Sequence, residues 1–131
     1  MAEEKKIKVL VVDDEPDVVS LLEVLLTSYN YSVITASDGQ LALEKARAER
    51  PDLLILDVML PKLDGYKVAR MLKFDENFSK IPIIMLTAKV TDKDKETGIE
   101  TGADIYLTKP FETDKLLAAI ETVLRKYSQN Q

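Results

Sequence analysis

Short runs of aliphatic residues alternate five times with longer stretches in which apolar and polar positions recur at helical spacing. The runs predict strands at Ile7–Val12, Ser32–Ala36, Leu53–Leu56, Ile81–Leu86 and Asp104–Leu107. The first, third and fourth runs are nearly continuous in Val, Ile and Leu, which is typical of strands buried on both faces of a parallel sheet. Pro82 has no backbone N–H, so it fits the fourth strand only near its start.

Helical patterns fill the intervals between these strands. One begins at Pro16, one opens at Asp38-Gly39 and stops before Pro51, one is capped by Asp64, and the last carries apolar residues from Leu116 to Tyr127. The segment Thr91–Thr101 has a single large aliphatic residue and an interior Gly98. We therefore predict that this fourth helix is loosely held and takes part in conformational change.

Strands that alternate with helices through right-handed crossovers predict a doubly wound α/β fold, with a five-stranded parallel sheet and helices on both faces. A length of 131 residues is expected for one domain, with a core from about residue 6 to residue 127. In such sheets ligands bind at the carboxyl ends of the strands, where the strand order reverses. The residues that follow each strand are therefore the candidates for function.

Polar side chains follow four of the five predicted strands. They are Asp13 and Asp14 after the first, Asp57 after the third, Thr87 after the fourth, and Thr108 with Lys109-Pro110 after the fifth. Each alone is compatible with a cap or a loop residue. Together they would converge on one crevice if the first, third, fourth and fifth strands are neighbours.

Three carboxylates within a few ångströms repel each other, so a proton or a hard cation must offset their charge. Oxygen ligands without Cys or His favour Mg²⁺, or Mn²⁺. A hydroxyl at Thr87 and an ammonium at Lys109 suit the oxygens of a phosphoryl group. Asp57 ends a rigid central strand, so it is the best candidate for an aspartate nucleophile that forms an acyl phosphate.

Composition narrows the classes of function. The chain contains no histidine and no cysteine, which excludes Ser-His and Cys-His nucleophile pairs, histidine-bound zinc and disulfides. A net charge of −5 argues against direct binding to nucleic acid. No segment approaches the roughly 20 apolar residues of a membrane span, so we expect a cytoplasmic protein that does not bind membranes.

Four motifs, VLVVDDEP, LLILDVMLPKLDGY, IIMLTA and GADIYLTKPF, occur in this order along the chain. In this combination the sequence resembles the receiver domain of response regulators, the CheY-like family of two-component signalling. The resemblance implies a flavodoxin-like sheet with strand order 2-1-3-4-5. It also implies a switch that changes its partner-binding face, with no enzymatic activity beyond Mg²⁺-dependent self-phosphorylation and autodephosphorylation.

The resemblance assigns roles to individual residues. Asp57 would accept a phosphoryl group from a histidine kinase or a phosphotransfer protein. The implied Mg²⁺ ligands are Asp14 directly, Asp13 directly or through water, Asp57, and the backbone carbonyl of Met59. Thr87 and Lys109 would contact the phosphoryl oxygens, and Tyr106 occupies the position of the family's aromatic switch. The Lys109–Pro110 peptide bond is expected to be cis.

Ile105, Met59 and Lys89 occupy positions that depart from the family pattern or vary within the family. Ile105 stands where many DNA-binding regulators carry an aspartate that forms a dimer salt bridge, so that dimer is not implied. Met59 and Lys89 lie two residues after Asp57 and Thr87, and we predict that their side chains tune dephosphorylation.

The alternative functions are an aspartate-phosphate hydrolase, a flavodoxin-like nucleotide binder and a phosphorylation-independent scaffold. The sequence motifs argue against each of these alternative functions. The hydrolases usually place their nucleophile after the first strand in a DxD pattern and carry a cap domain, whereas this strand ends in DDEP. A nucleotide binder needs a Ser, Thr or Gly phosphate loop at that point. A scaffold is disfavoured because all five family site residues are present.

Overall fold

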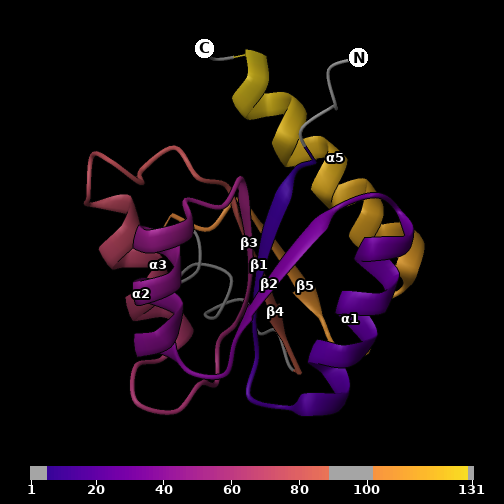
Figure 1. Cartoon of the computed structure of the whole chain (residues 1–131), viewed down its shortest axis with the longest axis horizontal. Helices are drawn as coiled ribbons and strands as arrows, with labels where there is room; N and C mark the ends of the chain where they lie inside the picture. Colours follow the sequence, from indigo (N-terminus) through magenta and orange to yellow (C-terminus); the bar gives the residue numbers. More distant parts are fainter. Residues whose placement is uncertain (1–5, 89–101, 130–131) are drawn as a thin grey trace.

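The computed structural model describes residues 6–88 and 102–129 (Figure 1). The strands are β1 Lys8–Val12, β2 Ser32–Ala36, β3 Leu53–Asp57, β4 Ile83–Thr87 and β5 Ile105–Thr108. The described helices are α1 Pro16–Ser28, α2 Gly39–Glu49, α3 Gly65–Lys73 and α5 Thr113–Gln129. The predicted fourth helix and Lys89 lie outside the described residues.

All five strands are parallel and follow the order β2-β1-β3-β4-β5, which confirms the predicted doubly wound fold. Helices α2 and α3 cover one face of the sheet, and α1 and α5 cover the other (Figure 1). Every residue of β3 and of β4 is buried. Continuous apolarity in the sequence therefore corresponds to burial on both faces.

Several strand boundaries differ from the prediction by one or two residues: β1 begins at Lys8, β4 ends at Thr87, β5 spans Ile105–Thr108, and the start of β4 and the end of β3 also differ. β4 begins at Ile83 rather than Ile81, and Pro82 supplies only its carbonyl, which accepts a hydrogen bond of 3.0 Å from the Leu54 N–H. β3 ends at Asp57, one residue later than predicted, where Asp57 pairs with Leu86 of β4. The carboxylate is therefore carried by the last residue of the ladder, which holds its backbone in the sheet.

The predicted helix starts agree with the structure. Pro16 lies in the first turn of α1. The Asp38 side chain accepts a hydrogen bond from the Leu41 N–H, and Asp64 accepts one from the Lys67 N–H, so both aspartates cap the helices that follow. Within the described residues, no helix is long and apolar enough to cross a bilayer.

Candidate functional site

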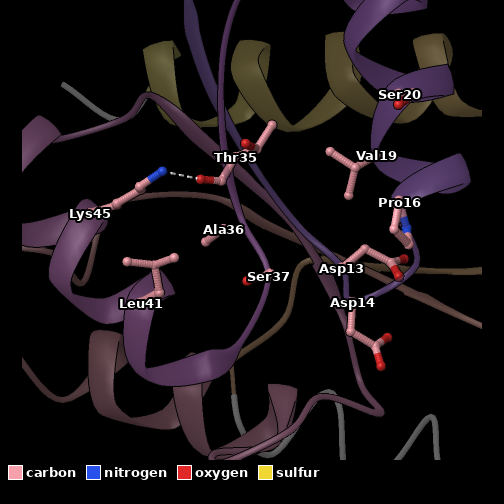
Figure 2. Close-up of a pocket in the computed structure, with 10 residues that line it drawn as sticks. All are labelled: Asp13, Asp14, Pro16, Val19, Ser20, Thr35, Ala36, Ser37, Leu41 and Lys45. Atoms are coloured by element: carbon pink, nitrogen blue, oxygen red, sulfur yellow. Dashed lines mark hydrogen bonds between the residues drawn. The ribbon is translucent and has the colours of Figure 1, made fainter.

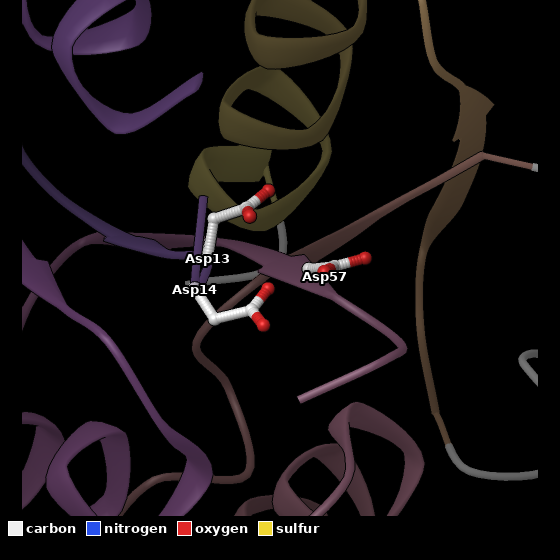
Figure 3. A group of neighbouring side chains, drawn as sticks. All are labelled: Asp13, Asp14 and Asp57. Carbon is white, nitrogen blue, oxygen red and sulfur yellow. The ribbon is translucent and has the colours of Figure 1, made fainter. Parts of the chain in front are cut away.

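The three predicted carboxylates meet at the carboxyl end of the sheet. Asp13 and Asp14 follow β1, and Asp57 ends the neighbouring strand β3, at the point where the strand order reverses (Figure 3). One carboxylate oxygen from each lies within 4.8 Å of the others. Asp13 and Asp57 are only 2% and 4% exposed, whereas Asp14 is exposed. The parallel topology thus creates a half-buried acidic cluster that is open to solvent on one side.

Lys109 joins the cluster from the segment after β5. Its Nζ lies 2.6 Å from Asp13 Oδ2 and 3.7 Å from Asp57 Oδ2. Its backbone N–H donates a 2.6 Å hydrogen bond to the Thr87 carbonyl, and the next peptide bond, Lys109–Pro110, is cis as predicted. The ends of β1, β3, β4 and β5 are therefore connected around one site.

The charges of the site are incompletely balanced. Burial raises the pKa of Asp57 to about 6, with a further contribution from the neighbouring Asp13 charge, although Lys109 and the Met59 backbone N–H oppose this rise. Burial acts to lower the pKa of Lys109, but its close contact with Asp13 and the Asp57 charge raise the pKa above the ordinary value. The site therefore favours an added positive charge, in the form of either a proton or a cation.

The residues present fit a hard divalent cation. Asp13 Oδ1 accepts a 2.9 Å hydrogen bond from the Glu15 N–H, which orients the carboxylate. Its Oδ2 is buried and, despite the ion pair with Lys109, has no well-directed hydrogen bond among the described residues. The available ligand atoms of the cluster are carboxylate oxygens, which Mg²⁺ and Mn²⁺ prefer.

The remaining predicted site residues surround this cluster. Thr87 is buried at the end of β4 and pairs with Thr108 of β5. Met59 follows Asp57 by two residues, and its side chain is 75% exposed. Ile105 is half-buried and packs against the core beneath α1 and α5, so it is not a freely exposed apolar residue.

Sequence reasoning missed Glu15 as a neighbour of the site. Its Oε1 lies 3.4 Å from Lys109 Nζ, and the Glu15 side chain remains largely exposed. The signal was available in the motif DDEP, where a third acid directly follows the aspartate pair. This contact places another acidic group beside Lys109 at the solvent edge of the site.

A cleft of about 330 Å³ opens between α1 and α2, beside the carboxylates (Figure 2). It is lined by Asp13, Asp14, Pro16, Val19, Ser20, Thr35, Ala36, Ser37, Leu41 and Lys45. Lys45 donates a hydrogen bond to the Thr35 carbonyl across one side of it. Asp57 does not line this cleft, so the cleft adjoins the carboxylate cluster and does not contain it.

Comparisons with known proteins show the family of the chain. The family model of the response regulator receiver domain matches residues 9–121. The alkaline phosphatase synthesis transcriptional regulatory protein PhoP of Bacillus subtilis is 51% identical over 119 residues, which are 91% of this chain and 49% of PhoP. The chain thus spans about half the length of the curated relatives it matches.

Solved structures give the same result. The chemotaxis protein CheY4 of Vibrio cholerae has a TM-score of 0.86 and 34% identity, over 91% of this chain and 99% of that chain. The receiver domain of a sensor histidine kinase of Pseudomonas aeruginosa, with a magnesium ion coordinated in its active site cleft, has a TM-score of 0.84 and 33% identity, over 92% and 98%. The chain belongs to the response regulator receiver domain family.

Proposed function

We propose that this chain is a signalling switch that accepts a phosphoryl group on Asp57 from a histidine kinase or a phosphotransfer protein. The observation that carries the proposal is the placement of the Asp57 carboxylate. It is buried at the end of a central strand, and Asp13, Asp14 and Lys109 lie around it. This arrangement combines a rigidly held nucleophile with a cation and additional carboxylate ligands.

The proposed metal ligands are Asp13, Asp14, Asp57 and the backbone carbonyl of Met59. Mg²⁺, or Mn²⁺ in its place, would neutralise charge that develops on a transferring phosphoryl group. The magnesium ion in the related Pseudomonas receiver structure supports this choice of cation. The raised pKa of Asp57 supports it as well, because a group that attracts a proton in the free site also gains from a cation.

In the proposed transfer, an ionised Asp57 oxygen forms a bond to the donor phosphorus. The bond between phosphorus and the donor breaks, and the leaving group departs with the electron pair. Lys109, held beside Asp57 by its ion pair with Asp13, would offset negative charge on a phosphoryl oxygen. The Thr87 hydroxyl would donate a hydrogen bond to another oxygen.

Phosphorylation adds roughly 1.5 to 2 negative charges at neutral pH. We propose that Thr87 moves toward these charges and that Tyr106 turns into the space it leaves, which changes the partner-binding face. Met59 and Lys89 would tune dephosphorylation. Turnover would be limited to self-phosphorylation and autodephosphorylation.

The proposed setting is a single receiver domain in the cytoplasm that contacts proteins rather than membranes. Its net charge of −5 disfavours direct contact with nucleic acid by this segment. The curated relatives include transcriptional regulators that are about twice as long. Any DNA binding in a longer protein would therefore belong to another segment.

Intact-mass spectrometry after incubation with Mg²⁺ and acetyl phosphate tests the proposal. The parent chain should gain the mass of one phosphoryl group, and Asp57→Ala should gain none. Asp64→Ala is a matched control, because it removes an aspartate from the loop after β3 without changing the cluster, and it should be phosphorylated. A parent chain that gains no mass, or that turns over small phosphoesters, would contradict the proposal.

A further inference from the structure

A tyrosine pair links α3 to β5. The hydroxyl oxygens of Tyr66 and Tyr106 lie 2.6 Å apart, at the short end of the range for O–H···O hydrogen bonds. Both side chains are half-buried and pack against the core layer beneath α2 and α3. A hydrogen bond in such a partly desolvated place stabilises the arrangement that contains it.

Tyr66 is also connected to the backbone around Asp57. It lies in the first turn of α3, and the preceding Gly65 N–H donates a 2.9 Å hydrogen bond to the Val58 carbonyl. A Cβ added at Gly65 would collide with the Asp57 carbonyl oxygen, so the helix start is pressed directly against the end of β3. A shift of the Asp57 backbone must therefore be accommodated by the turn that carries Tyr66.

Tyr106 connects the pair to the other side of the site. It pairs with Met85 of β4, and two residues later Thr108 pairs with Thr87, immediately before Lys109. Lys109 returns to Asp57 through its Nζ contact of 3.7 Å. The Tyr66–Tyr106 contact therefore links two routes that both lead to Asp57: one through the start of α3, and one through β5 and Lys109.

We propose that Tyr66 is a positioning residue that opposes switching by holding Tyr106 in the place described here. This inference rests on the proposed function, in which Tyr106 turns into the space left by Thr87. We infer that the hydroxyl contact breaks during that movement, so that its loss favours the switched arrangement. By linkage, the chain without this contact binds a phosphoryl mimic more tightly.

Titration with beryllofluoride in the presence of Mg²⁺ tests the inference. Tyr66→Phe removes only the hydroxyl and should raise the affinity about two- to tenfold, the range expected for one hydrogen bond. Tyr106→Phe removes the same contact, so adding Tyr66→Phe to it should raise the affinity less than Tyr66→Phe does in the parent. Tyr29→Phe is the matched control, because Tyr29 is 55% exposed at the end of α1, and it should leave the affinity unchanged.

A second measurement does not depend on the mimic. Ring ¹³C relaxation dispersion of Tyr106 should show a larger population of the alternative side-chain position in Tyr66→Phe than in the parent. Unchanged or weakened beryllofluoride affinity, or additive effects in the double variant, would overturn the inference alone. A parent chain that binds no beryllofluoride and gains no phosphoryl group would overturn the proposed function and this inference together.

Discussion

The two ends of the sheet carry acidic residues in opposite electrostatic situations. At the amino end, Asp104 precedes β5, and its Oδ2 accepts a 2.9 Å hydrogen bond from the Ile83 N–H. The Tyr127 hydroxyl donates to the same carboxylate at 3.1 Å and 3.3 Å, and Lys73 and Lys126 lie 3.9 Å and 3.6 Å away. At the carboxyl end, Asp13, Asp57 and the nearby Glu15 all pair with the same cation, Lys109. Asp14 adds a third carboxylate to the cluster.

This difference separates a balanced cluster of charges from an unbalanced one. The Asp104 cluster is saturated, because one acid is met by two cations and two hydrogen-bond donors, and it ties β4, β5, α3 and α5 together. Burial raises the pKa of Tyr127 to about 12, helped by the Asp104 charge, so its hydroxyl remains a donor at neutral pH. The Asp57 cluster is undersaturated, and its excess negative charge is relieved only when something binds.

The largest expected change in the free energy of unfolding comes from removing Asp104, the acid of the saturated cluster. Asp104→Ala should lower the free energy of unfolding by about 3 to 5 kcal/mol, because it leaves the half-buried Lys73 without its carboxylate and the Ile83 N–H without an acceptor. Urea unfolding measures this change. Asp52→Ala is the matched control, since Asp52 also precedes a strand and accepts from a backbone N–H, that of Lys8, but at an exposed site. If Asp104→Ala lowers the free energy of unfolding by less than about 1 kcal/mol, the contrast between the Asp104 and Asp57 clusters does not hold.

Removing the charge of Asp57, in the undersaturated cluster, should stabilise the chain. Without Mg²⁺ at pH 7, Asp57→Asn should raise the free energy of unfolding by about 1 to 3 kcal/mol, because the folded chain holds Asp57 with a pKa of about 6 instead of 3.8. Since the folded state binds the extra proton, this gain should shrink as the pH falls from 7 to 4. Urea titrations across that pH range provide the measurement, and a destabilised Asp57→Asn at pH 7 would contradict the prediction.

Competition between a proton and the metal should produce the next effect. Mg²⁺ affinity should fall about tenfold between pH 7 and pH 5, because Asp57 takes up a proton as the pH drops below about 6. Isothermal titration calorimetry measures this dependence, and Asp57→Asn should bind more weakly but without this pH dependence. If parent and variant show the same pH profile, Asp57 is not the titrating ligand.

The smallest effect should come from one hydroxyl of the saturated cluster. Tyr127→Phe removes a donor to Asp104 and an acceptor 2.7 Å from Lys73 Nζ, so the free energy of unfolding should fall by about 1 kcal/mol. Tyr29→Phe, at an exposed position, should change it by less than about 0.5 kcal/mol. Equal effects in the two variants would show that the hydroxyl at position 127 contributes nothing through this network.

Much of the fold followed from simple patterns in the sequence. Continuous Val, Ile and Leu runs predicted the central strands because burial on both faces permits few other residues. The carboxylates and Lys109 could be grouped because a parallel sheet gathers the carboxyl ends of its strands at one edge. The exact start of β4 was missed because Ile81 is as apolar as the strand itself, while Pro82 only accepts a bond from Leu54.

Contacts between distant residues were beyond such patterns. The Tyr66–Tyr106 pair joins residues 40 positions apart, and the Glu15–Lys109 contact joins residues 94 apart. Asp104 was read as the first residue of a strand, without its partners on α3 and α5. Helical and strand periodicity report which face a residue occupies, but the choice of partner depends on how the finished layers pack.

Helix α5 runs back along the sheet (Figure 1). Its Tyr127 lies beside Asp104, which precedes β5 at the end of the sheet opposite the one where Asp57 ends β3. A fluorescent reporter or a second domain fused after this helix would therefore lie away from the carboxylates and would not block access to them. A pull through such a tether would act on the last turns of α5, where the Tyr127–Asp104 hydrogen bond connects the helix to the start of β5.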